Sequence, residues 1–464
     1  MLNPLLDSRL DRPFDNKVVS KSKTTRADSP SLYGVAQICF PLILSAFSST
    51  FMIFLDRIIL AKYDTQAMIS ATTAGNLLLI FQHGAFYIAM TAEVWVGRFN
   101  GAKQYQDIAK PVWQMIWFAL FCTSIMIPVG LFMGKWLIPD AFALDGIPYF
   151  KWMMIFGGTS PLIAALSAFY IGRKQVKLVM MFIISGNLLN VGLAFAFVFG
   201  LSPFIEPMGA KGAAIASGLS QSCIALGLLL AFLKKSNRIK FNTHHWAFDW
   251  AILSQCFKLG LPNAIGHVIA TAAWAMVLAL LAKKSTDHVT VMSIGMSIWL
   301  LFAFVTEGLQ QGMTSLAANY IGAGKQGALD MILKTGLQLQ FLIAMLLSIP
   351  LVFFPEIIIG WFFPQEAGNL QEVLEMSCRW LWVAYLFDGM AWVIDGILTA
   401  LGDTRFIMFM NSFGTWLFFI LPIYFFIIKL AGTPILTLQL IALFCFILFS
   451  SYALRYKSLK KKST

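Results

Sequence analysis

The sequence predicts an all-α membrane protein with twelve transmembrane helices in two pseudo-symmetric six-helix bundles. The first observation is composition: 58% of the 464 residues are hydrophobic and only 12% are charged. A soluble domain carries about 25% charged residues, so most of this surface must face lipid. The second observation is the spacing of long apolar segments, and the third is a repeat between the two halves of the chain.

Apolar segments long enough to cross a bilayer recur along the whole chain. A membrane-spanning helix needs about 20 mostly apolar residues, and open strand edges cannot be satisfied in lipid, so each segment is expected to be a helix. The twelve spans are expected near 34–56, 67–91, 109–134, 149–171, 177–200, 210–233, 252–281, 289–315, 331–359, 373–400, 406–428 and 433–454.

The polar stretches between these spans indicate the domain organisation and orientation. With the N-terminus inside, most of the 34 Lys and Arg residues fall on the cytosolic side, so both termini are expected in the cytoplasm of a plasma (inner) membrane protein. The N-terminal segment lacks the apolar core of a signal peptide. The expected parts are a cytosolic tail (1–33), a first bundle (34–233), a cytosolic linker (234–250), a second bundle (251–455) and a basic cytosolic tail (456–464).

The two bundles carry matching landmarks. Pro41 recurs as Pro262, and the loop 101–104 (GAKQ) recurs as 323–326 (AGKQ), each after the second span of its half. Six spans is an even number, so the second copy enters the membrane with the orientation of the first. Two parallel bundles related by an axis along the membrane normal are typical of alternating-access transporters. Pro41 and Pro262 are the expected hinges.

Several carboxylates fall within apolar spans, where a charged side chain costs about 3 kcal/mol on insertion scales. Asp56 ends the run FMIFLD, and its neighbour Arg57 cannot face it on a helix. Asp56 is therefore either a cation or proton site in the first bundle or an interfacial cap at the helix end. Asn187 and Asn190 in the fifth span either orient and hydrate Asp56 or pack helices together.

The tenth span carries two carboxylates and an indole on one stripe. Asp388, Trp392 and Asp395 follow the i, i+4, i+7 spacing of a helix face. Charge and cation–π attraction suit this stripe to an organic cation. The alternative is that Asp395 pairs with Arg379 or another basic group and is structural.

Two further acidic residues, Glu93 and Glu307, lie in the second and eighth spans, with Gln310 one turn after Glu307. They are expected to contact substrate or relay ions. The alternative is a buried polar pair that locks two helices.

Other classes of function are disfavoured by what the chain contains. The net charge of +12 is spread over short clusters between apolar runs, which disfavours nucleic-acid binding. We find no HExxH motif, nucleophile elbow or Gly-rich phosphate loop, so an enzyme is not expected. No cofactor is expected, and the one metal considered is a Na⁺ ion at Asp56.

The chain resembles the multidrug and toxic compound extrusion (MATE) family, nearest its NorM-like branch. The resemblance spans residues 34–455 and is carried by the order and spacing of several motifs. These are FPLILSAFSSTFMIFLDRIILA, VGRFNGAKQ, SGNLLNVGLAFAFVFG, MGAKGAAIASGLSQ, KLGLPNA and DGMAWVIDGILTALGDTR.

The resemblance implies a V-shaped pair of bundles around a central cavity and export of cationic, amphipathic compounds driven by Na⁺ or H⁺. By position, Asp56 and Asn190 match the first-bundle cation or proton site, and Asp388 matches the second-bundle site. The chain departs from the NorM-like pattern at Ala270, where that branch has Glu, and at Ala384, where the family has Tyr. A second site built from that Glu and the Asp is therefore in doubt, and Glu307 or Asp395 is the conjectured substitute.

The expected function is thus a secondary antiporter that exports cationic or amphipathic drugs or metabolites in exchange for H⁺ or Na⁺. Its expected partners are a small molecule and the bilayer, and it is expected to act as a monomer. The alternative is a lipid-linked precursor flippase of the same superfamily. Flippases of this kind favour cationic cavities for pyrophosphate, whereas the charges within these spans are mainly acidic.

Overall fold

The computed structural model describes residues 31–201, 203–362 and 371–463, and helices dominate this part of the chain. The predicted tail 1–33 lies almost entirely outside the described residues. Apart from one isolated bridge between Leu201 and Ile205, the described residues form no β structure. The all-α fold class predicted from composition is confirmed.

The first half of the chain forms one bundle, the N lobe. Its spans cover the predicted segments, but α1 extends to Tyr63, well past the predicted end at 56, and the predicted segment 149–171 is divided between α6 and α7. The helices are α1 (Leu32–Tyr63), α2 (Thr65–Met90), α3 (Ala92–Gly101), α4 (Ala109–Phe132), the short α5 (Gly134–Leu137), α6 (Ala143–Ile155), α7 (Thr159–Ile171), α8 (Val176–Phe199) and α9 (Gly209–Phe232).

The second half forms the C lobe, reached through α10 (Lys235–Phe241) in the segment predicted as a linker. π-helical turns fill 349–353 and most of 410–429. The last helix continues through the segment predicted as a basic tail. The helices are α11 (Trp250–Ala282), α12 (Thr286–Gly322), α13 (Leu329–Ser348), α14 (Pro355–Phe362), α15 (Gln371–Leu401), α16 (Thr404–Phe409) and α17 (Pro434–Ser463).

The second span of each lobe is bent. In the described residues, 10 helices can each cross a membrane by length and composition, and two bent pairs bring the number to 12. The bends are 44° between Thr65–Leu78 and Ile80–Gly101, and 46° between Thr286–Leu300 and Phe302–Gly322. Both bends fall at the same place in their lobe, which agrees with the internal repeat. The helices α1 and α11 run through Pro41 and Pro262 without a break.

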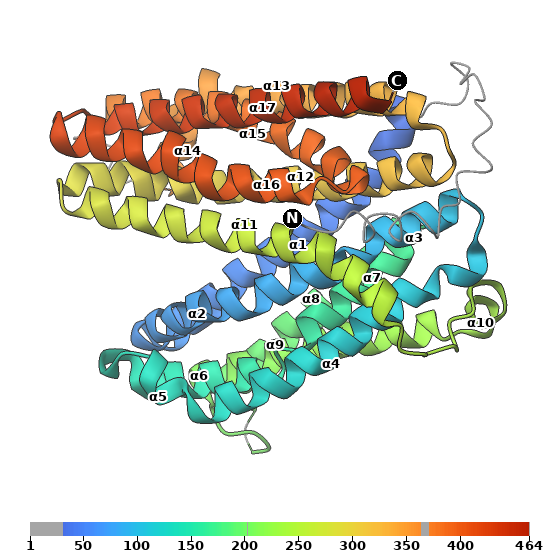
Figure 1. Ribbon diagram of the computed structural model, residues 1–464. Coiled ribbons are helices and arrows are strands. Elements are labelled where there is room, and N and C mark those ends of the chain that lie inside the picture. The colour runs from blue at the N-terminus through green and yellow to red at the C-terminus, as the bar shows by residue number, and fades with distance from the viewer. Residues whose placement is uncertain (1–30, 202, 363–370, 464) are drawn as a thin grey trace, which may run out of the picture.

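The two lobes lie side by side, diverge toward the end that carries α5, and approach each other near α3 (Figure 1). At the end where the lobes approach each other, α3 crosses α12 at very short range. A Cβ atom on Gly101 would collide with the backbone oxygen of Asn319, and one on Gly322 with the backbone of Arg98. Asn100 Nδ2 also donates to Asn319 Oδ1 at 2.7 Å. Glycine thus lets the lobes close at this end, here called the closed end, and the V shape follows.

Candidate functional site

A chain of polar side chains joins three helices inside the N lobe. The Ser217 hydroxyl of α9 donates to Asp56 Oδ2 of α1 at 3.2 Å. Asn190 Nδ2 of α8 donates to the Ser217 oxygen at 2.9 Å. Asp56 and Asn190, paired by position in the sequence, therefore meet through a serine that the sequence reading did not single out. This group of three is called the N-lobe site below.

Two oxygens of the N-lobe site have no hydrogen-bond donor within the described part of the chain. They are Asp56 Oδ1 and Asn190 Oδ1, and both are buried. A buried polar atom without a partner is costly, so each needs water, a proton on the carboxylate, or a cation. Carboxylate and amide oxygens are the ligands that hard cations prefer.

The position of Asp56 within α1 bears on one of its two interpretations, the helix-end cap. The helix continues to Tyr63 and is followed by its cap residue Asp64, so Asp56 lies inside the helix and the interpretation as a helix-end cap is wrong. The predicted end of this span at residue 56 was placed too early, because a pair of charged residues normally marks the edge of the membrane. Arg57 is exposed, as expected for a neighbour that cannot face Asp56.

Asn187 lies one turn from Asn190 but makes different contacts. Its Nδ2 donates to Ser48 Oγ at 2.9 Å and lies 3.4 Å from Ser49 Oγ, both on α1. The structure therefore joins Asn187 to α1 but not to Asp56 itself. This arrangement agrees with the packing alternative weighed for the fifth-span asparagines.

A small polar cavity lies between the lobes and brings together three predicted substrate residues: Glu93, Glu307 and Gln310. Its volume is about 50 Å³, which holds a few water molecules but not a drug-sized molecule. It is called the interlobe cavity. The lining residues are Phe86, Tyr87, Met90, Thr91, Glu93, Val94, Asn263, Glu307, Gln310, Gln311, Thr314 and Thr399.

Acceptor oxygens from opposite lobes face this cavity without partners. Glu93 of α3 is 2% exposed and Asn263 of α11 is 6% exposed. Glu93 Oε1 and Asn263 Oδ1 have no hydrogen-bond partner in the described residues. Glu307 of α12 is accessible from the cavity. A water cluster, a cation or the charged part of a ligand would satisfy these groups, so the cavity is suited to positive charge.

In the C lobe, Asp395 is held by neutral donors. Gln310 Nε2 of α12 donates to Asp395 Oδ1 at 2.6 Å, and Thr399 Oγ1 donates to the same oxygen at 3.3 Å. Arg379 is exposed on the same helix and forms no ion pair with Asp395 among the described residues. The alternative of a structural Arg379–Asp395 pair is not what the structure shows.

Asp388 is also buried in the C lobe, 9% exposed. Trp392 and Asp395 follow one and two turns later on α15, and both lie close enough to act on the Asp388 carboxylate. Gln340 of α13 approaches over Gly389, where a Cβ atom would collide with the Gln340 amide. The tenth-span stripe is thus one connected polar group inside the lobe, called the C-lobe site: Asp388, Trp392 and Asp395.

A stack of aromatic rings links the C-lobe site to the N lobe. The Tyr87 ring of α2 stacks on His267 of α11, with centroids 4.1 Å apart and planes 2° apart. His267 in turn lies 5.6 Å from Trp392, ring centroid to ring centroid. The Tyr87 phenol also interacts electrostatically with Glu307 and Asp395. The interlobe cavity, the stack and the C-lobe site therefore form one continuous region.

Several residues of these sites were not predicted from the sequence, and they differ in whether a local sequence pattern could have identified them. Thr399 lies four residues after Asp395, so helix spacing alone could have found it. Asn263 follows Pro262 in the KLGLPNA motif. Ser217 and Tyr87 carry no local signal, because their partners are far away in the chain.

The pattern of the MatE family matches residues 41–196 and 262–425, which is more than half of the chain and covers both lobes. The chain belongs to the MatE family. The resemblance drawn from the sequence motifs is confirmed, and the membrane setting and transporter class follow from it.

Named relatives agree with this assignment. The "probable multidrug resistance protein NorM" of Brucella suis biovar 1 is 24% identical over 443 residues, 89% of each chain. The protein of the same name from Thermotoga maritima is 22% identical over 367 residues, 78% of each chain. These relatives are named as resistance proteins and not as enzymes, in agreement with the expectation from the motifs.

Solved structures show the same fold. An outward-facing multidrug resistance MATE family transporter of the MOP superfamily superposes with a TM-score of 0.83 at 15% identity, covering 95% of this chain and 100% of that one. A MOP superfamily transporter from Pyrococcus furiosus superposes with a TM-score of 0.80 at 14% identity, covering 95% and 100%. At such identity the likeness concerns the fold alone.

Proposed function

We propose that this MATE family member exports cationic, amphipathic small molecules from the cytosol in exchange for H⁺ or Na⁺. The observation that carries the proposal is the acidic character of the region between the lobes. Glu93 and Glu307 line the interlobe cavity, and Asp395 lies beside it on the Gln310 amide. No lysine or arginine lines this described cavity. The multidrug resistance names of the relatives support export of small molecules.

In this proposal the N-lobe site loads the coupling ion. Asp56 Oδ1 and Asn190 Oδ1 lack donors in the described residues, and a proton or Na⁺ at Asp56 would satisfy them. Neutralising a buried carboxylate lowers its cost of desolvation. The protein with an ion at Asp56 therefore favours a different arrangement of helices from the protein without one. Export is coupled only if ion and substrate favour different states.

The C-lobe site takes the cationic part of the substrate and, with Asp388, a second coupling charge. Ala270 stands where the NorM-like branch has Glu, and we propose that Asp395, fixed by Gln310 and Thr399, supplies the missing carboxylate. Trp392 and the Tyr87–His267 stack offer π faces to a cation. The 50 Å³ interlobe cavity must widen for this, which the alternating-access cycle would provide.

The proposal also assigns each end of the molecule to one side of the membrane. We propose that both termini and the 234–250 linker are cytoplasmic in the plasma (inner) membrane, so the closed end faces the cytosol and the diverging end faces out. One chain, with lobes 34–233 and 251–455, then suffices as the transporting unit. The helices α1 and α11, which contain Pro41 and Pro262, are the proposed bending elements.

The test is efflux of a fluorescent organic cation from vesicles reconstituted with the protein, with pH and Na⁺ gradients imposed separately. One of the two gradients is expected to drive efflux, and dissipating it should stop transport. Efflux that is indifferent to both gradients would rule out antiport. Translocation of a lipid-linked pyrophosphate but no cation would favour the flippase alternative, which the acidic cavity disfavours.

A further inference from the structure

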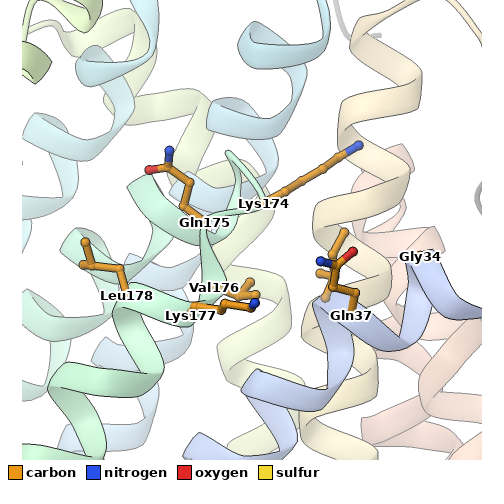
Figure 2. Close-up of a pocket in the computed structure, with 8 residues that line it drawn as sticks. Gly34, Gln37, Lys174, Gln175, Val176, Lys177 and Leu178 are labelled. Carbon is orange, nitrogen blue, oxygen red and sulfur yellow. The ribbon is translucent and has the colours of Figure 1, made fainter.

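A second and larger cavity opens at the closed end of the molecule, between the start of α1 and the start of α8 (Figure 2). Its volume of about 620 Å³ falls in the range of small-molecule sites. It is called the basic cavity. The lining residues are Gly34, Gln37, Ile38, Lys174, Gln175, Val176, Lys177 and Leu178.

The charge of the basic cavity is opposite to that of the interlobe cavity. Lys174 and Lys177 line it, and none of its lining residues in the described part of the chain is acidic. Within residues 31–201, 203–362 and 371–463, neither ammonium group forms a salt bridge. Figure 2 shows Lys177 extending toward α1, where Gln37 stands on the facing helix. Two positive charges therefore border one concave space, with no carboxylate partner among the described residues.

The start of α8 adds to this positive potential. The helix begins at Val176, and Gln175 before it provides no side-chain cap. The first backbone N–H groups of a helix have no intrahelical acceptor and carry the positive end of the helix dipole. Val176, Lys177 and Leu178, whose N–H groups these are, all line the basic cavity. Such a helix start favours anions.

The backbone holds Lys174 in an unfavourable conformation. Its φ of 61° is left-handed, which costs a residue other than glycine about 1 kcal/mol. At the equivalent turn of the C lobe the left-handed residue is Gly402, which adopts this conformation without that cost. Burial lowers the pKa of the Lys174 ammonium from its ordinary value, because the surrounding protein solvates the charged form less well than water does. A bound anion would offset both costs.

Lys174 also reaches across to the other lobe. Its ammonium lies 5.3 Å from the centre of the Tyr320 ring of α12, one residue from the Asn319 that seals the closed end. An anion held at Lys174 would therefore sit on the seam between the lobes. Ile38, Val176 and Leu178 provide an apolar wall beside the charges.

We propose that the basic cavity binds the phosphate group of an anionic ligand, held by Lys174, Lys177 and the N–H groups at the start of α8. The same chemistry is presented by an anionic phospholipid headgroup and by a soluble phosphate. The Lys and Arg distribution of the sequence places this end in the cytosol, where anionic lipids attract basic segments. The inference is independent of the cargo proposed above.

The experiment uses the full chain in an uncharged detergent, titrated by calorimetry with dioctanoyl phosphatidic acid, dioctanoyl phosphatidylcholine and inorganic phosphate. The test variant is K174Q/K177Q. The matched control is K135Q/K211Q, which removes the same charge from two exposed lysines. Phosphatidic acid is expected to bind wild type and control equally. It should bind the test variant at least about tenfold more weakly, because each lysine beside an anionic headgroup contributes about 1 kcal/mol.

The three ligands distinguish a lipid headgroup from a soluble phosphate, and the variants distinguish a wrong proposal from a protein that does not fold. Competition by inorganic phosphate at similar concentration identifies a soluble phosphate, and binding of phosphatidic acid alone identifies a headgroup. Equal binding to wild type and K174Q/K177Q overturns the proposal, as does phosphatidylcholine binding as tightly as phosphatidic acid. If the double variant does not fold, K177Q alone carries the test, since Lys177 is exposed and in an ordinary helical turn.

Discussion

The two lobes repeat the same helices but build their acidic sites differently. In the N lobe a single carboxylate, Asp56, meets Ser217 and Asn190 from two other helices. In the C lobe two carboxylates share α15, and Gln310 and Thr399 donate to one of them. The internal repeat therefore fixes where the helices lie and where they bend, whereas each lobe carries its own polar chemistry. In the function proposed above, this asymmetry assigns the coupling ion to one lobe and the larger organic cation to the other.

The largest expected effect comes from removing the charge of the N-lobe site. D56N keeps the size of the side chain and can still accept from Ser217, but it cannot exchange a proton or neutralise Na⁺. We expect ion-driven efflux to fall to the level of protein-free vesicles, with an unchanged melting temperature. Reconstituted efflux under each gradient measures this.

The control for that experiment is R57Q, which changes the adjacent exposed charge and should leave efflux intact. Full ion-driven activity of D56N would remove Asp56 from the mechanism. It would also shift the coupling role to the C lobe and end the division of labour drawn above.

A smaller effect is expected in the C lobe, because a second carboxylate remains. D395N can still accept from Gln310 and Thr399, so the lobe should fold, while one substrate-facing charge is lost. We expect the half-saturating concentration of a monovalent organic cation to rise about tenfold, a little over 1 kcal/mol of lost attraction. Transport kinetics with a neutral and a cationic substrate separate charge recognition from general damage.

R379Q distinguishes the two interpretations of Asp395. Arg379 is exposed, so the variant should behave as wild type. A change in R379Q as large as in D395N would restore the structural pair as the explanation.

The closed end offers a third way to probe the comparison, since both lobes contribute glycines to it. G101A places a methyl group against the backbone of Asn319, and overpacking of this kind costs about 1–3 kcal/mol. We expect a lower melting temperature and a population shift away from this arrangement. The control is G75A, where nothing lies within 4 Å of the added Cβ. An equal fall in melting temperature in G75A would show that the close crossing of α3 and α12 is not the cause.

The sequence was sufficient for what depends on composition and local order. Span length and hydrophobicity predicted the helices, and the apolar surroundings of Asp56 and Asp388 identified them as costly charges. Glu93, Glu307 and Gln310 were each found singly, but their meeting in one cavity depends on how α3, α11 and α12 cross. That crossing is set by glycines such as Gly101 and Gly322, whose contacts lie in the other lobe and leave no mark in the local sequence.

Ser217 could not be predicted from the local sequence, since its partner Asp56 is 161 positions away. Substitution of Ser217 gives the smallest effect that we expect. S217A removes a hydrogen bond to a carboxylate, worth about 1.5–3 kcal/mol when fully buried. Asp56 is only partly buried, so the loss should be nearer 1 kcal/mol, about a fivefold change in half-saturating ion concentration. Thr at this position would keep the hydroxyl, and S217T should recover most of the wild-type value. If S217A and S217T behave alike, the serine only fills space, and the N-lobe site reduces to Asp56 alone.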